Sequence, residues 1–128
     1  MTTAPPPQYL YTLDEDLYRL GNATSPKLDN VRPQDVDTYE RNGILMVRAN
    51  GKGMSVGTLA YLKLLRISGW LWKIPATTLL PQGLLFHPDP NPAKLGHFFL
   101  CPNSDMTMDK YRALLSQLAL HCERTQKP

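Results

Sequence analysis

The sequence predicts a single α+β domain with a largely antiparallel, split β-sheet, a short central helix and a C-terminal helix. Short runs rich in aromatic and β-branched residues recur along the chain, separated by Gly, Pro, Asn and Asp turn signals. Only two stretches carry apolar residues at helical spacing. The 12 prolines among 128 residues argue against an all-helical bundle. A chain of this length suits one domain with a modest core.

The N-terminal part is expected to begin with a disordered arm. Residues 1–8 contain Pro5-Pro6-Pro7 and no apolar pattern, so we assign residues 9–126 to the folded domain. Residues 35–41 are compatible with either a helical turn or a strand. Asn42-Gly43 then predicts a hairpin, because both central residues of a type I′ turn need positive φ. Strands are expected at residues 9–13, 17–20, 44–49, 54–56, 70–74, 84–87 and 96–101.

Two helices complete the predicted fold. The first is expected at residues 58–67, where leucines recur at helical spacing and Thr58 is placed to serve as the N-cap. The second follows a cap at Asp105 or Thr107. Its apolar stripe comprises Met108, Tyr111, Leu114, Leu115, Leu118 and Leu120.

The composition restricts the possible partners and compartment. The formal net charge is +3, which is compatible with an anionic ligand, but Lys and Arg are scattered and predict no specific nucleic-acid binding. Cys101 and Cys122 are expected to be reduced thiols, because two cysteines make no disulfide framework or metal-ligand spacing. The N-terminus shows no signal peptide. Residues 59–71 are too short and too charged to cross a membrane. We therefore expect a cytoplasmic protein.

The stretch from Leu17 to Gly21 places an arginine on the opening strand. In a strand, Arg19 points to the opposite face from Tyr18 and Leu20. If the tyrosine and the leucine pack inward, the guanidinium faces a cleft or solvent, where its planar charge suits a phosphate. The alternative is a surface arginine in an ion pair with Asp14 or Asp16.

Two further residues are candidates for chemistry. Ser55 follows the glycine-rich turn of residues 50–53 and precedes the first helix. His97 opens a late strand directly after Gly96, although a histidine there is also compatible with a packed structural role. The glycine-rich turn lacks the spacing of a P-loop, and no nucleophile-elbow motif or histidine pair with metal spacing is present.

These residues resemble motifs of a known family. Tyr18-Arg19-Leu20-Gly21 resembles the first-strand region of ADP-ribosyltransferases, in which the arginine contacts NAD. Met54-Ser55-Val56-Gly57-Thr58 resembles their serine-containing strand, in which the serine supports the nicotinamide ribose and the arginine. The similarity is closest to the small type VI secretion effector toxins of the exported-effector-two type, which have an ADP-ribosyltransferase-like fold. It spans residues 15–122 through stretches 35–36, 42–43, 53–56, 72–75, 79–84, 89, 96–98, 102, 106, 111 and 115.

The resemblance implies a site and a departure from it. It implies that NAD is the substrate, that Arg19, Ser55 and His97 are the catalytic residues, and that Tyr18, Gly21 and Gly53 join Arg19 and Ser55 in holding NAD. Transferases of this kind use a late glutamate beside the ribose, whereas the only glutamate here after Glu40 is Glu123. His97 takes that place, and Asp89 or Asp105 is expected to supply negative charge.

The implied function is that of a bacterial toxin. It would reach the target-cell cytoplasm through secretion machinery without a cleavable signal and arrest growth there. An acidic immunity protein is the expected partner, with no membrane or specific nucleic acid involved. Two alternatives remain: a binding module with a degenerate transferase fold, and a small adaptor or immunity protein.

Overall fold

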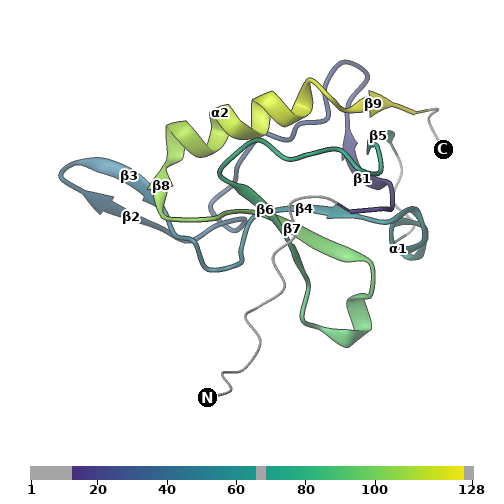
Figure 1. The fold of residues 1–128 in the computed structure, drawn as a ribbon, viewed down its shortest axis with the longest axis horizontal. Helices are drawn as coiled ribbons and strands as arrows, with labels where there is room; N and C mark the ends of the chain where they lie inside the picture. Colours follow the sequence, from purple (N-terminus) through teal and green to yellow (C-terminus); the bar gives the residue numbers. More distant parts are fainter. Residues whose placement is uncertain (1–12, 66–68, 126–128) are drawn as a thin grey trace.

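The computed structural model describes residues 13–65 and 69–125, and it forms two antiparallel sheets with two α-helices (Figure 1). The larger sheet has six strands in the order β6-β7-β4-β1-β5-β9, and the smaller has the order β2-β3-β8. The strands are β1 Leu17–Gly21, β2 Thr38–Arg41, β3 Ile44–Val47, β4 Met54–Gly57, β5 Trp70–Ile74, β6 Leu84–Pro88, β7 His97–Pro102, β8 Met106–Thr107 and β9 Glu123–Arg124. The helices are α1 Leu59–Leu64, the 3-10 turn η1 Pro92–Lys94, and α2 Met108–Ala119. The predicted α+β class with split antiparallel sheets is confirmed.

The large sheet opens between its two halves. β1 and β4 are neighbours, yet they are paired in register only at Tyr18 and Gly57. On either side, β4 pairs with β7 and β1 pairs with β5 over the length of the shorter strand. The open stretch lies beside Arg19 and Ser55, so the sheet itself creates the place where the two candidate residues meet.

The main core lies between α2 and the large sheet (Figure 1). Tyr111 of α2 is fully buried, and its hydroxyl donates to the carbonyl of Leu100 and accepts from the N–H of Met54. One side chain therefore ties the helix to both β4 and β7. Burial raises the pKa of the Tyr111 phenol, so it stays protonated and keeps donating.

Several local predictions are confirmed. Asn42 and Gly43 have φ of 53° and 78°, as a type I′ hairpin requires, and the uncertain stretch before them ends in strand β2. Thr58 accepts from the N–H of Tyr61 and caps α1. Thr107, not Asp105, caps α2 by accepting from the N–H of Lys110.

Other elements differ from the predictions. Strands β8 and β9 were not expected, because two residues show no periodicity and both strands depend on a partner far away in the chain. Helix α1 ends at Leu64, before the expected end at residue 67. The arm predicted at residues 1–8 and nearly all of the strand predicted at 9–13 lie outside the described residues.

Within the described ranges, no helix is long and apolar enough to cross a membrane, and no group of three His, Cys, Asp or Glu residues is placed to hold a metal ion. Cys101 and Cys122 are both free. Burial raises the pKa of each thiol to about 11, which keeps both protonated and unreactive near neutral pH.

Candidate functional site

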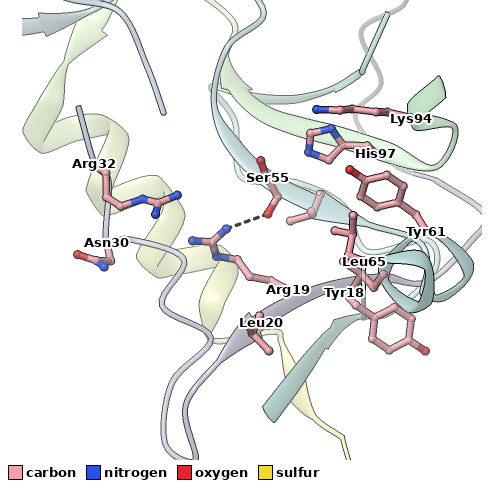
Figure 2. A pocket seen from close by; sticks show the side chains of 12 residues that line it. Tyr18, Arg19, Leu20, Asn30, Arg32, Ser55, Tyr61, Leu65, Lys94 and His97 are labelled. Carbon is pink, nitrogen blue, oxygen red and sulfur yellow. Dashed lines mark hydrogen bonds between the residues drawn. The ribbon is translucent and has the colours of Figure 1, made fainter. Parts of the chain in front are cut away.

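A pocket of about 530 Å³ lies where the sheet opens (Figure 2). Strands β1, β4 and β7 contribute side chains to it, together with helix α1 and the loop that follows β1. Its lining comprises Tyr18, Arg19, Leu20, Asn30, Arg32, Ser55, Val56, Tyr61, Leu62, Leu65, Lys94 and His97. Arg19, Ser55 and His97, which are widely separated in the sequence, therefore share one pocket.

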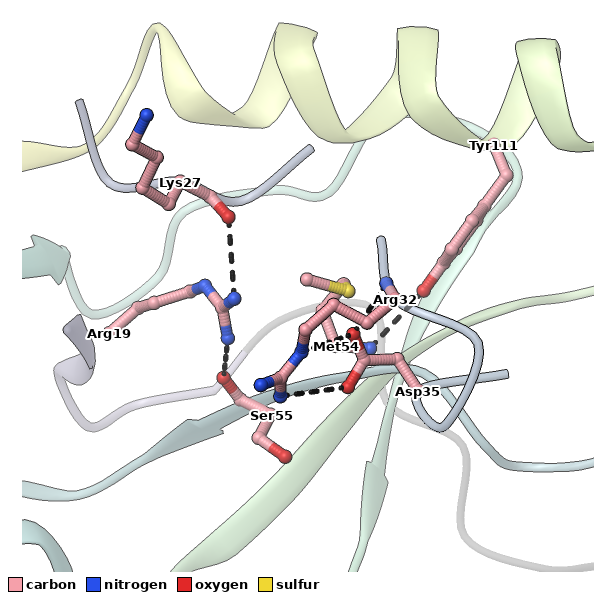
Figure 3. Close-up of polar contacts among 7 residues, drawn as sticks. All are labelled: Arg19, Lys27, Arg32, Asp35, Met54, Ser55 and Tyr111. Carbon is pink, nitrogen blue, oxygen red and sulfur yellow. Dashed lines mark hydrogen bonds and ion pairs between the residues drawn. The ribbon is translucent and has the colours of Figure 1, made fainter. Parts of the chain in front are cut away.

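Arg19 bridges the opening in the sheet. Its Nη1 donates to the carbonyl oxygen of Ser55 at 2.8 Å, and its Nη2 donates to the carbonyl oxygen of Lys27 at 3.3 Å (Figure 3). Its Nε is buried and has no hydrogen-bond partner among the described residues. Burial lowers the pKa of the guanidinium, Asp35 opposes this shift, and the positive charge of Arg32 adds to it. An arginine remains charged throughout, so the site holds a partly desolvated cation.

The ion-pair alternative for Arg19 is wrong. Asp16 instead accepts from the N–H of Ala76 at 2.6 Å, and no carboxylate of the described chain forms a salt bridge with Arg19. The condition that Leu20 packs inward is not met, since this side chain is 37% exposed. The alternation along β1 is as predicted, but the main core lies on the face of Leu17, which is the face of Arg19. Tyr18 packs on the other face, against the small cluster of Tyr61, Leu62 and Leu71.

Ser55 contributes to the site in two separate ways. Its carbonyl oxygen holds Arg19, whereas its side-chain hydroxyl is exposed in the pocket and has no partner in the described part of the chain. Any residue at position 55 would offer the same carbonyl. The serine side chain itself is therefore free to bind a ligand.

His97 is held by a carboxylate. Its Nδ1 lies 2.7 Å from Oδ2 of Asp89, and the two side chains are only 10% and 9% exposed. The ring of Tyr61 stacks on the imidazole at 5.1 Å, and Phe99 meets it edge-on at 4.7 Å. With Asp89 ionised, Nδ1 carries a proton and Nε2 is left as the nitrogen that can meet a ligand.

Asp89 is the acid that supports His97, and Asp105 is not. Burial acts to raise the pKa of Asp89, but hydrogen bonds from the N–H of Asn91 and from His97 bring it below its ordinary value. Asp105 accepts instead from the hydroxyl of Tyr39 at 2.6 Å and the N–H of Ala49 at 2.8 Å, away from the pocket lining. The structure thus identifies Asp89 as the carboxylate beside His97, whereas the sequence left both Asp89 and Asp105 as candidates.

The two glycines expected to bind NAD do not line the pocket. A Cβ on Gly21 would lie 2.3 Å from the carbonyl oxygen of Ser25, and one on Gly53 would lie 1.8 Å from that of Leu100. Both positions need glycine because another stretch of main chain passes close by. Tyr18, the remaining residue expected to hold NAD, does line the pocket.

Sequence reasoning missed several residues that line this pocket. Arg32 and Lys94 bring further positive charge, and Tyr61 supplies the ring that covers His97. Arg32 and Lys94 belong to a loop and to the 3-10 turn η1, where no periodic pattern indicates which side chains face inward. No carboxylate is among the described residues that line the pocket.

The split antiparallel sheets and the two helices are consistent with an ADP-ribosyltransferase-like toxin domain. The chain belongs to the Tse2 ADP-ribosyltransferase toxin family, whose sequence model matches residues 8–127. The comparison with curated proteins and the comparison with solved structures found no match. Membership of this family implies NAD as the substrate and toxicity as the biological role.

Proposed function

We propose that this protein cleaves NAD in the pocket between β1, β4 and β7, transfers ADP-ribose to a target molecule, and thereby arrests growth of the cell that receives it. The observation that carries the proposal is the convergence of Arg19, Ser55 and His97 on one pocket of a domain from this toxin family. The positive charge of the pocket suits the pyrophosphate of NAD.

Each residue has a role that its contacts support. Arg19 binds the pyrophosphate with N–H groups that its two carbonyl partners leave free. The Ser55 hydroxyl hydrogen-bonds the nicotinamide ribose. When the glycosidic C–N bond breaks, nicotinamide leaves with the electron pair, and the ribose carries oxocarbenium character. A nucleophile of the target then forms the new bond at that carbon and gives up its proton.

His97 and Asp89 act where other transferases use a glutamate. A neutral imidazole alone stabilises a neighbouring cation poorly, but Asp89 places a full negative charge behind it at 2.7 Å. Nε2 of His97 accepts a hydrogen bond from a ribose hydroxyl or takes the proton of the nucleophile. If His97 takes the proton of the nucleophile, the reaction needs no other base in the pocket lining.

The proposal extends to the biological setting of the protein. The protein acts in the cytoplasm of a target cell after delivery by secretion machinery without a cleavable signal, and the producing cell carries an immunity protein. An acidic partner would complement the net charge of +3.

The test measures nicotinamide released from NAD by the purified protein, together with growth of bacteria that express it. We expect nicotinamide release and growth arrest from the native chain, and loss of both with Arg19→Gln. The lack of a carboxylate in the pocket lining favours one alternative, a binding module without chemistry. Growth arrest together with NAD binding and no nicotinamide release would establish that alternative instead.

A further inference from the structure

Two guanidinium groups face one another at one side of the pocket. Figure 2 shows Arg19 reaching from β1 and Arg32 reaching from the following loop, with their charged ends directed toward each other. The charge of Arg32 acts to lower the pKa of Arg19, and Asp35, which pairs with Arg32, acts more strongly to raise it. Asp35 therefore offsets the repulsion between the two guanidinium groups, and the N–H groups that they leave free in the pocket can bind an anion between them.

Arg32 is held so that half of its guanidinium stays available. Its Nε and Nη2 donate to the two carboxylate oxygens of Asp35, each at 3.3 Å, and its main-chain N–H donates to the same group at 2.8 Å (Figure 3). Asp35 is 9% exposed, whereas the Arg32 side chain is 59% exposed. The edge formed by Nη1 and Nη2 has no partner in the described chain beyond the single bond from Nη2. A guanidinium fixed on one side edge can bind a phosphate bidentately with this outer edge.

The loop that carries Arg32 is anchored. Leu28, Val31 and Val36 are buried in the main core around it, at 0%, 9% and 3% exposure. The same loop supplies the Lys27 carbonyl that holds Arg19. The loop backbone that carries Arg32 is therefore fixed by packing and Asp35 restrains its side chain, which reduces the ordering cost of binding a ligand there.

We propose that Arg32, fixed by Asp35, is a second phosphate-binding residue that pairs with Arg19 to hold the pyrophosphate, and that the pocket therefore selects pyrophosphate-linked dinucleotides over unphosphorylated nucleosides. That the ligand is NAD rests on the proposed function. That Arg19 and Arg32 bind a phosphate anion rests on the pocket alone. Each phosphate of the pyrophosphate binds one of the two guanidinium groups. Arg32 is a binding residue here and takes no part in bond cleavage.

The experiment compares Arg32→Gln with Arg112→Gln, which removes the same charge from an exposed position on α2. For Arg32→Gln we expect KM for NAD to rise on the order of tenfold or more, with kcat within roughly twofold of native. Arg112→Gln should match the native protein. Cleavage of nicotinamide riboside, which has no phosphate, should be equal in all three. Thermal melting checks that the variants are folded.

Calorimetry with inorganic pyrophosphate separates this inference from the proposed function. If the native chain neither cleaves nor binds NAD, the proposed function fails, but Arg32 is still tested by its effect on pyrophosphate affinity. Weaker pyrophosphate binding in Arg32→Gln than in Arg112→Gln supports the inference. The pyrophosphate affinity of Asp35→Asn should fall between those of the native protein and Arg32→Gln, because Arg32 keeps its charge but its guanidinium is no longer held by a carboxylate. Equal pyrophosphate affinity in Arg32→Gln and Arg112→Gln, or an equal loss with nicotinamide riboside, overturns it.

Discussion

The pocket has a β1 wall, formed by Arg19 and the residues that hold it, and a β7 wall, formed by His97 and Asp89. Arg19 is held by two main-chain carbonyl oxygens, whereas His97 is held by a single carboxylate, that of Asp89. Carbonyl oxygens are present whatever the side chains are, so the Arg19 position depends on the path of the backbone. The His97 position depends on one replaceable side chain. We therefore expect the β1 wall to tolerate changes in its supporting residues and the β7 wall to be sensitive to them.

The walls also differ in charge. The β1 wall and its neighbouring loop bring two guanidinium groups together, while the β7 wall carries a buried negative charge behind an imidazole. This division matches the proposed reaction, in which a pyrophosphate is bound on one side and a cationic ribose forms on the other. The four predictions below test this comparison, beginning with the largest effect.

Removing the cation of the β1 wall should have the largest effect. We expect Arg19→Gln to lower kcat/KM for nicotinamide release from NAD by about a hundredfold or more, because charge-assisted hydrogen bonds to the phosphates are lost. Steady-state kinetics measure it, with Arg112→Gln as the control for loss of an arginine. A variant that folds and retains full activity would show that the anion site lies elsewhere.

Removing the support of the β7 wall should come next. Asp89→Asn keeps the shape of the side chain but removes its charge, and we expect kcat to fall about tenfold or more while the affinity for NAD changes little. The readout specific to positioning is nitrogen-15 NMR of the His97 ring. It should report the Nδ1–H tautomer in the native protein and a changed tautomer balance in the variant. An unchanged balance would contradict this role for Asp89.

Replacing the side chains of the two residues whose carbonyl oxygens hold Arg19 should have less effect than either change above. Lys27→Ala retains the carbonyl that holds Arg19, so kcat/KM should match the native value. Ser55→Ala also keeps its carbonyl and loses only the hydroxyl, so we expect a loss of roughly tenfold. The same kinetics compare both with Arg19→Gln. A loss of kcat/KM in Lys27→Ala as large as that in Arg19→Gln would contradict the view that the backbone, and not neighbouring side chains, holds Arg19.

The smallest effect concerns stability and pH. The pKa of Asp89 lies below its ordinary value of 3.8, so its ionised form stabilises the fold. This contribution is fully present above the ordinary pKa and is lost as pH falls through the lower folded pKa. The native protein should therefore melt higher than Asp89→Asn at pH 6, and the difference should shrink toward pH 2. Asp14→Asn, at an exposed position, is the matched control for the loss of one carboxylate.

Local features of the fold were predictable from the sequence. The Asn42-Gly43 hairpin, the Thr58 cap and strand β5 each depend on φ preferences, one capping bond or a run of a few residues. These interactions join near neighbours, so the residues that encode them stand together in the sequence. Strand β9 was missed because its two residues pair with Trp72 and Lys73, far earlier in the chain.

The candidate site divides in the same way. The sequence by itself, through its resemblance to the toxin family, indicated Arg19, Ser55 and His97 and the alternation that turns Arg19 away from Tyr18. Only the tertiary structure decided that Asp89 rather than Asp105 supports His97, and that Gly21 and Gly53 pack against main chain. It alone brought Arg32 to face Arg19. The physical reason is that these contacts depend on sheet register and loop path. The bond from Arg19 to Ser55 joins residues 36 positions apart, and no local preference specifies it.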